Sequence, residues 1–101
     1  MQEACHTMHM GEVLNASHPD YPLHEAVIYG DKLNCAKLSK RLSCAIKHLP
    51  IKVRFTYVYD TQKALESGII KDPTLVLDTK ILLEGLPQAE EITEAFKDLL
   101  N

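Results

Sequence analysis

The sequence predicts one α/β domain, a three-layer sandwich around a mixed four-stranded sheet with the element order β-α-β-α-β-β-α. Three observations predict it. A short apolar run at 26–29 ends at a glycine, residues 34–49 carry apolar side chains at helical spacing, and apolar stretches at 74–77 and 81–83 flank a turn. A strand, a helix and a strand in succession indicate a right-handed parallel crossover, whereas a tight turn pairs its two strands antiparallel.

Periodicity defines the first half of this unit. Residues 26–29 suit a central strand that is buried on both faces, and residues 51–58 alternate as expected for a half-exposed edge strand. Asn34 is the expected N-cap of the helix between them, and Pro50 ends that helix. One face of the helix carries five apolar residues, namely Leu38, Leu42, Ala45, Ile46 and Leu49.

Turn and cap residues define the second half. Asp60 can cap a short helix that ends before Gly68. Residues 78–80 form the turn of the closing hairpin. Gly85 and Pro87 then precede a last helix with an apolar stripe of Ile92, Ala95, Phe96 and Leu99.

The chain divides near residue 25. Residues 1–24 show no sustained period of 3.6 or 2, so we expect a flexible N-terminal tail. Residues 25–101 hold the predicted strands and helices and form the folded domain.

Composition excludes several classes of protein. A chain of 101 residues with 46% hydrophobic and 25% charged residues is typical of one globular domain. No apolar run approaches the ~18 residues of a membrane helix, so no membrane partner is expected. Residues 31–54 are basic, but the net charge of −3 and the lack of interleaved aromatic residues argue against a nucleic-acid partner.

The N-terminus and the cysteines indicate a compartment. The chain starts without a basic segment followed by an apolar one, which favours the cytoplasm over secretion. Three cysteines are an odd number, so a disulfide framework is not expected.

Three short motifs, at 27–30, 34–38 and 71–77, together with Gly85, resemble the small thioredoxin- and glutaredoxin-like proteins, and most closely the redox-active disulfide proteins. The resemblance covers residues 26–100. It implies a thioredoxin-like fold in which a Cys-x-x-Cys motif opens the first helix. It also implies a cis proline, here Pro73, that begins the third strand and packs beside the thiols.

One position departs from this pattern. Alignment places the second cysteine of the pair at residue 38, which is Leu38. Cys44 cannot replace it, because nine helical residues separate it from Cys35 by ~13 Å of rise and half a turn. A disulfide needs Cα atoms within ~7 Å, so a Cys35–Cys44 bond is excluded.

Cys35 is the candidate catalytic residue. In the first turn of a helix, unpaired N–H groups and the helix dipole favour a thiolate, and Lys32 and Lys37 add positive charge. Asp72 opposes them, because a carboxylate near the sulfur raises its pKa. The alternative is that Cys35 is a buried and inert small hydrophobe.

The resemblance also implies a substrate-binding edge at Asp72, Pro73 and Thr74. In thioredoxin-like proteins the backbone before the cis proline pairs with an extended peptide or with glutathione. Asp72 would discourage a partner with a carboxylate at this place.

The tail offers other chemistry. Thiol, imidazole and thioether groups suit Cu(I) or zinc, and the tail holds Cys5, His6, Met8, His9 and Met10. Few strong ligands lie at clear spacing, so no metal site and no cofactor are predicted. An iron–sulfur cluster is excluded because it needs four thiolates. Cys5 could instead fold back as a resolving thiol for Cys35, and Cys44 is expected to be exposed and without a role.

The leading hypothesis is therefore a cytoplasmic thiol-redox protein that acts through Cys35 alone, by mixed-disulfide exchange with a protein or small-molecule thiol or disulfide. A second hypothesis is a non-catalytic thioredoxin-like module for binding or assembly. A third is metal handling by the tail.

Overall fold

The computed structural model describes residues 5–100, in which the predicted elements follow in order behind one additional strand. The five strands form one mixed sheet in the order β1-β3-β2-β4-β5, one strand more than the sequence predicts. The elements are β1 (Val13–Leu14), β2 (Leu23–Tyr29), α1 (Lys32–Ile46), β3 (Lys52–Val58), α2 (Thr61–Glu66), β4 (Thr74–Leu77), β5 (Lys80–Glu84) and α3 (Ala89–Leu100).

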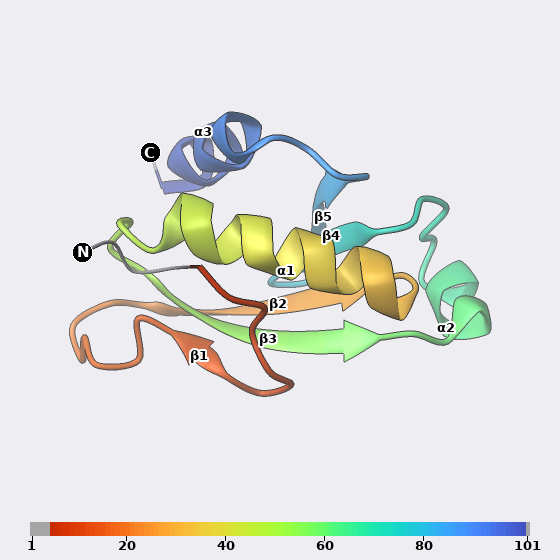
Figure 1. Cartoon of the computed structure of the whole chain (residues 1–101), viewed down its shortest axis with the longest axis horizontal. Coiled ribbons are helices and arrows are strands. Elements are labelled where there is room, and N and C mark those ends of the chain that lie inside the picture. The colour runs from red at the N-terminus through yellow and green to blue at the C-terminus, as the bar shows by residue number, and fades with distance from the viewer. Residues whose placement is uncertain (1–4, 101) are drawn as a thin grey trace.

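The topology confirms the predicted α/β class. Strands β2 and β3 are parallel and joined through α1, while β4 pairs antiparallel with both β2 and β5. Figure 1 shows α1 lying along β2 and β3, with α3 beside α1 and α2 beyond the end of β3. Along residues 5–100, no helix combines the length and the apolar character that a membrane crossing requires.

The core lies between the sheet and the pair α1 and α3. Alternate residues of the central strands point into it, including Ile28 and Phe55, and Leu38 and Phe96 meet them from the two helices. Each of these four side chains is fully buried, and burial of a large apolar side chain contributes ~1.5–3 kcal/mol. This core holds the start of α1 firmly against the end of β2, where the candidate site lies.

Helix α1 begins three residues earlier than the sequence predicts. Asp31, not Asn34, is the N-cap, and its side chain accepts a hydrogen bond from the Asn34 N–H at 2.7 Å. Asp31 has the extended backbone that an N-cap needs. The earlier start makes Cys35 the fourth residue of the helix, and the Cys35 N–H already donates to the Asp31 carbonyl at 2.9 Å.

The cap and the turn that the sequence predicts in the second half of the fold are present in the structure. Asp60 caps α2 by accepting from the Gln62 and Lys63 N–H groups, as predicted. The predicted tight turn joins β4 to β5, with positive φ angles of 49° at Asp78 and 73° at Thr79.

The N-terminal segment, residues 5–14, differs from the flexible tail that we expected over 1–24. It runs beside α1 and then turns back at the edge of the sheet, where β1 pairs antiparallel with β3 (Figure 1). Met8 is buried in the core at 2% exposure. The prediction that β3 is an edge strand is therefore wrong, because β1 pairs with part of it. Residues 1–4 lie outside the described residues.

Side chains of the domain hold this segment in place. The Met8 N–H donates to Ser39 Oγ at 2.8 Å, and the Tyr57 hydroxyl donates to the Met8 carbonyl. Ser43 Oγ donates to the His6 carbonyl at 2.9 Å. These are single contacts from residues scattered along the chain, which explains why no periodic pattern in the sequence predicts them.

Candidate functional site

The candidate site lies where the β2–α1 turn meets the segment before β4. The Asp72–Pro73 peptide bond is cis, and it faces Gly30 in the turn. Gly30 has a φ of 154° and donates its N–H to the Val58 carbonyl at 3.1 Å. A Cβ atom at Gly30 would lie 3.1 Å from Pro73 Cα and would overlap the Asp72 carboxylate. The close approach of the two backbones therefore requires glycine at residue 30.

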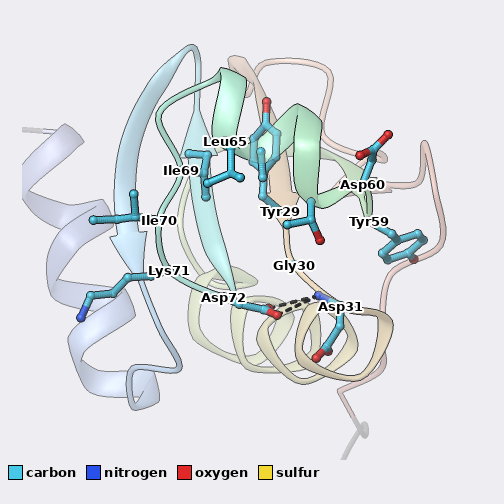
Figure 2. Close-up of a pocket in the computed structure, with 12 residues that line it drawn as sticks. Tyr29, Gly30, Asp31, Tyr59, Asp60, Leu65, Ile69, Ile70, Lys71 and Asp72 are labelled. Atoms are coloured by element: carbon cyan, nitrogen blue, oxygen red, sulfur yellow. Dashed lines mark hydrogen bonds between the residues drawn. The ribbon is translucent and has the colours of Figure 1, made fainter.

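The Asp72 carboxylate ties the two segments together. It accepts hydrogen bonds from the Asp31 N–H at 3.1 and 3.2 Å, shown as dashed lines in Figure 2. It also accepts from the Asn34 side-chain amide at 3.3 Å. The carboxylate thus stabilises the start of α1, where negative charge is favourable.

Of the three predicted substrate-binding residues, Asp72 is accessible to a partner, whereas Pro73 and Thr74 are not. Asp72 is exposed and lines a surface pocket. Pro73 and Thr74 are buried, and the Thr74 hydroxyl donates to the Lys71 carbonyl at 2.7 Å. Only Asp72 of the three therefore presents its side chain to a partner.

Cys35 lies beneath this turn. Its residue is 1% exposed, and its Sγ lies 3.7 Å from the Ile28 carbonyl oxygen, to which the thiol donates. Burial, with smaller contributions from the charges of Asp72 and Asp31, raises the pKa of Cys35 to about 12. The helix-start effect that the sequence suggested is outweighed, because desolvation of a thiolate in an apolar core is the larger contribution. At neutral pH the thiol is protonated.

This pKa predicts slow alkylation of Cys35. With a pKa of about 12 in place of 9.0, the thiolate fraction at pH 7 falls about a thousandfold. We expect iodoacetamide to modify Cys35 at least a hundredfold more slowly in the native protein than in denaturant, as measured by mass spectrometry. Equal rates in the two conditions would contradict this geometry.

The same pKa fixes the direction of a stability change. Above pH 9 the unfolded thiol loses its proton while the folded thiol keeps it up to about pH 12, so the unfolded state binds fewer protons. The contribution of Cys35 to stability therefore falls as the pH rises from 9 to 12.

The pocket beside Asp72 was not predicted from the sequence. Its volume is about 170 Å³. Figure 2 shows Leu65 and Ile69 directed toward Tyr29, so that apolar side chains form one wall. Leu65 is 61% exposed on α2, a six-residue helix with no buried residue, so its apolar side chain is accessible to a partner. One signal for this wall is visible in the sequence, since Leu65 and Ile70 lie outside every predicted apolar stripe.

Cys5 and Cys44 form a disulfide with a Cα–Cα separation of 5.3 Å. Cys35 is the free cysteine in residues 5–100. The expectation that Cys5 could resolve Cys35 is therefore wrong in this structure, as are the expectations that no disulfide forms within the chain and that Cys44 has no role. Cys44 is exposed, as predicted. The pairing joins the N-terminal segment to α1 and depends on a packing that the sequence pattern does not indicate.

The soft ligands of the N-terminal segment are not brought together. Cys5 is held in the disulfide, Met8 is buried, and Met10 Sδ accepts from the Tyr57 N–H at 3.4 Å. Among residues 5–100, no group of three or more His, Cys, Asp or Glu side chains could hold a metal ion. Metal handling by this segment has no support in the arrangement of these side chains.

A family model described as "Thioredoxin domain" matches residues 27–97, about two thirds of the chain. Comparison with curated proteins and with solved structures gave no match. The matched region begins in β2, contains Cys35 and Pro73, and ends in α3. The chain therefore belongs to the thioredoxin domain family.

Proposed function

We propose that this protein is a thioredoxin-fold binding module that holds a side chain of a partner protein in the pocket beside Asp72. The observation that carries the proposal is the contrast between an accessible apolar pocket and a buried, protonated Cys35. A thiol enzyme needs an accessible thiolate at the place where its partner binds.

The size of the pocket supports a side chain as its occupant. Sites for whole small molecules usually enclose about 300–1,000 Å³. The 170 Å³ beside Asp72 is smaller and open to the surface, so it suits one aliphatic or aromatic side chain of an extended segment. Leu65 and Ile69 supply the apolar contact for it.

Charge supports a cationic neighbour for that side chain. Asp31 and Asp72 both line the pocket at the turn. Lys71 also lines it, but Figure 2 shows its ammonium directed away from Asp72. A partner segment with Lys or Arg next to its apolar anchor would therefore be attracted, and an acidic segment repelled.

A second candidate is mixed-disulfide exchange through Cys35 with a thiol or disulfide of a protein or a small molecule. It is supported by the position of the free thiol of Cys35. The thiol donates to the Ile28 carbonyl, and the next residue of β2, Tyr29, lines the pocket. Exchange would require the Gly30–Asp31 turn to move away from Asp72. A Cys35→Ser variant separates the candidates, because the binding module keeps its partner affinity and the exchange protein loses its reaction.

A peptide library tests the binding proposal. We expect random heptapeptides selected on the full chain to place a large apolar residue next to Lys or Arg. Leu65→Lys should weaken the selected peptides at least tenfold in fluorescence polarisation, because it puts a charge in the apolar wall. Asp72→Asn keeps an acceptor for the Asp31 N–H and should weaken the preference for basic residues, because one of the two carboxylates is lost, while the selection of an apolar anchor is unchanged.

Ile81→Lys is the matched control, since Ile81 is 49% exposed on β5 and does not line the pocket. This variant should bind as the wild type does. Selection of acidic peptides, or equal binding by the Leu65→Lys and wild-type proteins, would refute the proposal.

A further inference from the structure

The Cys5–Cys44 disulfide lies at the far end of α1 from the pocket. Cys44 is exposed and Cys5 is partly exposed, so a dissolved thiol can approach the bond from the Cys44 side. Access to a sulfur is a main determinant of the rate of thiol–disulfide exchange. The buried Cys35 offers no such access.

Cationic side chains lie on one side of Cys44. Lys40 and Arg41 precede it by four and three residues on α1, so they share its face of the helix. A hollow next to Cys44 is lined by Lys37, Lys40, Arg41, Gln88 and Ala89, and none of these lining residues of the described chain is acidic. Arg41 is fixed there, because it donates to the Leu86 and Pro87 carbonyls at 2.8 and 3.0 Å.

The other side of Cys44 faces α3. A second hollow there is lined on the α3 side by Glu90, Glu94 and Lys97, and on the α1 side by His48. The charges on this side are mixed, whereas those toward Lys40 are all positive. An anion that approaches Cys44 is therefore held on the Lys37 and Lys40 side.

We propose that the Cys5–Cys44 disulfide is an exchange site for small anionic thiols, and that Cys44 is the sulfur that carries the mixed disulfide. The lysines bind the anionic group of the thiol beside the exposed sulfur. This activity is separate from the proposed binding pocket, because it uses neither Asp72 nor Cys35.

The exchange balances with two small thiols. The first thiolate attacks Cys44 Sγ, forms the mixed disulfide and releases Cys5 as a thiolate, which takes up a proton from water. A second thiolate attacks the small-thiol sulfur of the mixed disulfide and releases the Cys44 thiolate. The products are two protein thiols and one oxidised small disulfide, so the protein gains two electrons and the two small thiols lose them.

The N-terminal segment keeps Cys5 within reach after reduction. The hydrogen bonds of Ser43 to the His6 carbonyl and of Ser39 to the Met8 N–H do not involve the disulfide. Cys5 therefore stays near Cys44, and an oxidised small disulfide can reverse the reaction. In a compartment that holds a pool of small thiols, that pool would supply the reductant.

Thiols that differ in charge test the proposal. The oxidised full chain is treated with mercaptoethanesulfonate, mercaptoethanol or cysteamine at equal thiolate concentration, then quenched and mapped by mass spectrometry. We expect the anionic thiol to form the mixed disulfide at Cys44 faster than the cationic thiol, on the order of tenfold at low salt. About 0.5 M salt should reduce this difference to near unity, because screening shortens the range of the attraction.

Variants locate the effect. Lys37→Gln combined with Lys40→Gln should remove most of the preference for the anionic thiol. Lys63→Gln combined with Lys80→Gln removes the same charge from α2 and β5 and should leave the preference unchanged. Equal rates for the three thiols, a mixed disulfide found only at Cys5, or no Cys5–Cys44 cross-link in the oxidised protein would each overturn the proposal.

Discussion

Replacing Lys32 with cysteine should give this protein a disulfide reductase activity. Lys32 is the exposed first residue of α1, and it precedes Cys35 by three residues. Positions i and i+3 on a helix place their Cβ atoms about 5–6 Å apart, and small adjustments bring two sulfurs into bonding distance. The new thiol would meet unpaired N–H groups and the helix dipole, which favour a thiolate, and Cys35 would lie beneath it as the resolving thiol.

The measurement is the reduction of insulin disulfides in the presence of dithiothreitol. We expect the Lys32→Cys variant to exceed the wild type by on the order of 10²-fold, since intramolecular resolution benefits from effective molarities of ~10⁵ M or more. Lys37→Cys adds the same thiol at an exposed position that does not face Cys35, so it should stay at the wild-type level. A Lys32→Cys variant without activity, or one that forms no intramolecular disulfide on oxidation, would contradict this geometry.

This prediction also concerns the missing cysteine of the family pattern. Alignment places the missing cysteine at Leu38. Leu38 lies on the buried face of α1 and is fully buried, so a sulfur there could not reach a partner. The depth of Cys35 makes it resemble the inner cysteine of a pair, and residue 32 is the matching outer position. Spacing along a sequence locates a thiol on a helix but does not give its depth, which depends on where the helix begins.

Gly30→Ala should destabilise the domain more than any other glycine substitution in the described chain. The added Cβ would overlap the Asp72 carboxylate and lie 3.1 Å from Pro73 Cα, at a φ of 154° that side chains rarely adopt. Overpacking and backbone strain of about 1–3 kcal/mol each predict a loss of about 2–6 kcal/mol in the free energy of unfolding. A domain of this size has roughly 5–15 kcal/mol in total, so the loss is large.

Urea unfolding followed by circular dichroism measures this loss. Gly68→Ala is the matched control, because Gly68 has a φ of 81° but no atom within 4 Å of its added Cβ, so backbone strain alone remains, about 1 kcal/mol. Asp72→Ala in the Gly30→Ala background should recover part of the loss by removing the carboxylate. A Gly30→Ala protein as stable as the Gly68→Ala protein would show that the turn can move away from Pro73.

The sequence predicted the elements that have regular periods or strong local residues. Helical spacing of Leu38 and Leu42, alternation in β3 and the cap at Asp60 each depend on neighbours within a few positions. The sequence predicts the start of α1 three residues too late, because Asp31 and Asn34 are both good N-cap residues. The choice between them depends on Asp72, 38 residues beyond Asn34, whose carboxylate engages the Asn34 side chain.

Two features of the site depend on contacts that no local pattern indicates. The N-terminal segment is held by Met8 in the core, by the hydrogen bond that the Met8 N–H donates to Ser39 and by the one that Tyr57 donates to the Met8 carbonyl, so its sequence carries no period. The Cys5–Cys44 pairing follows from that placement. The reactivity of Cys35 was left open by opposing arguments, and its burial decides in favour of the protonated thiol.

The two-residue strand β1 has a consequence for how this sheet behaves among copies of itself. A long exposed strand offers a row of free N–H and C=O groups on which another chain can add. On the β3 side the outermost strand is β1, which is too short to template such growth. On the opposite side β5 begins with Lys80, and the ladder that it forms with β4 is irregular at Leu75 and Val76. Both edges of the sheet are therefore poor sites for edge-to-edge pairing with another copy, and the N-terminal segment covers one of these edges.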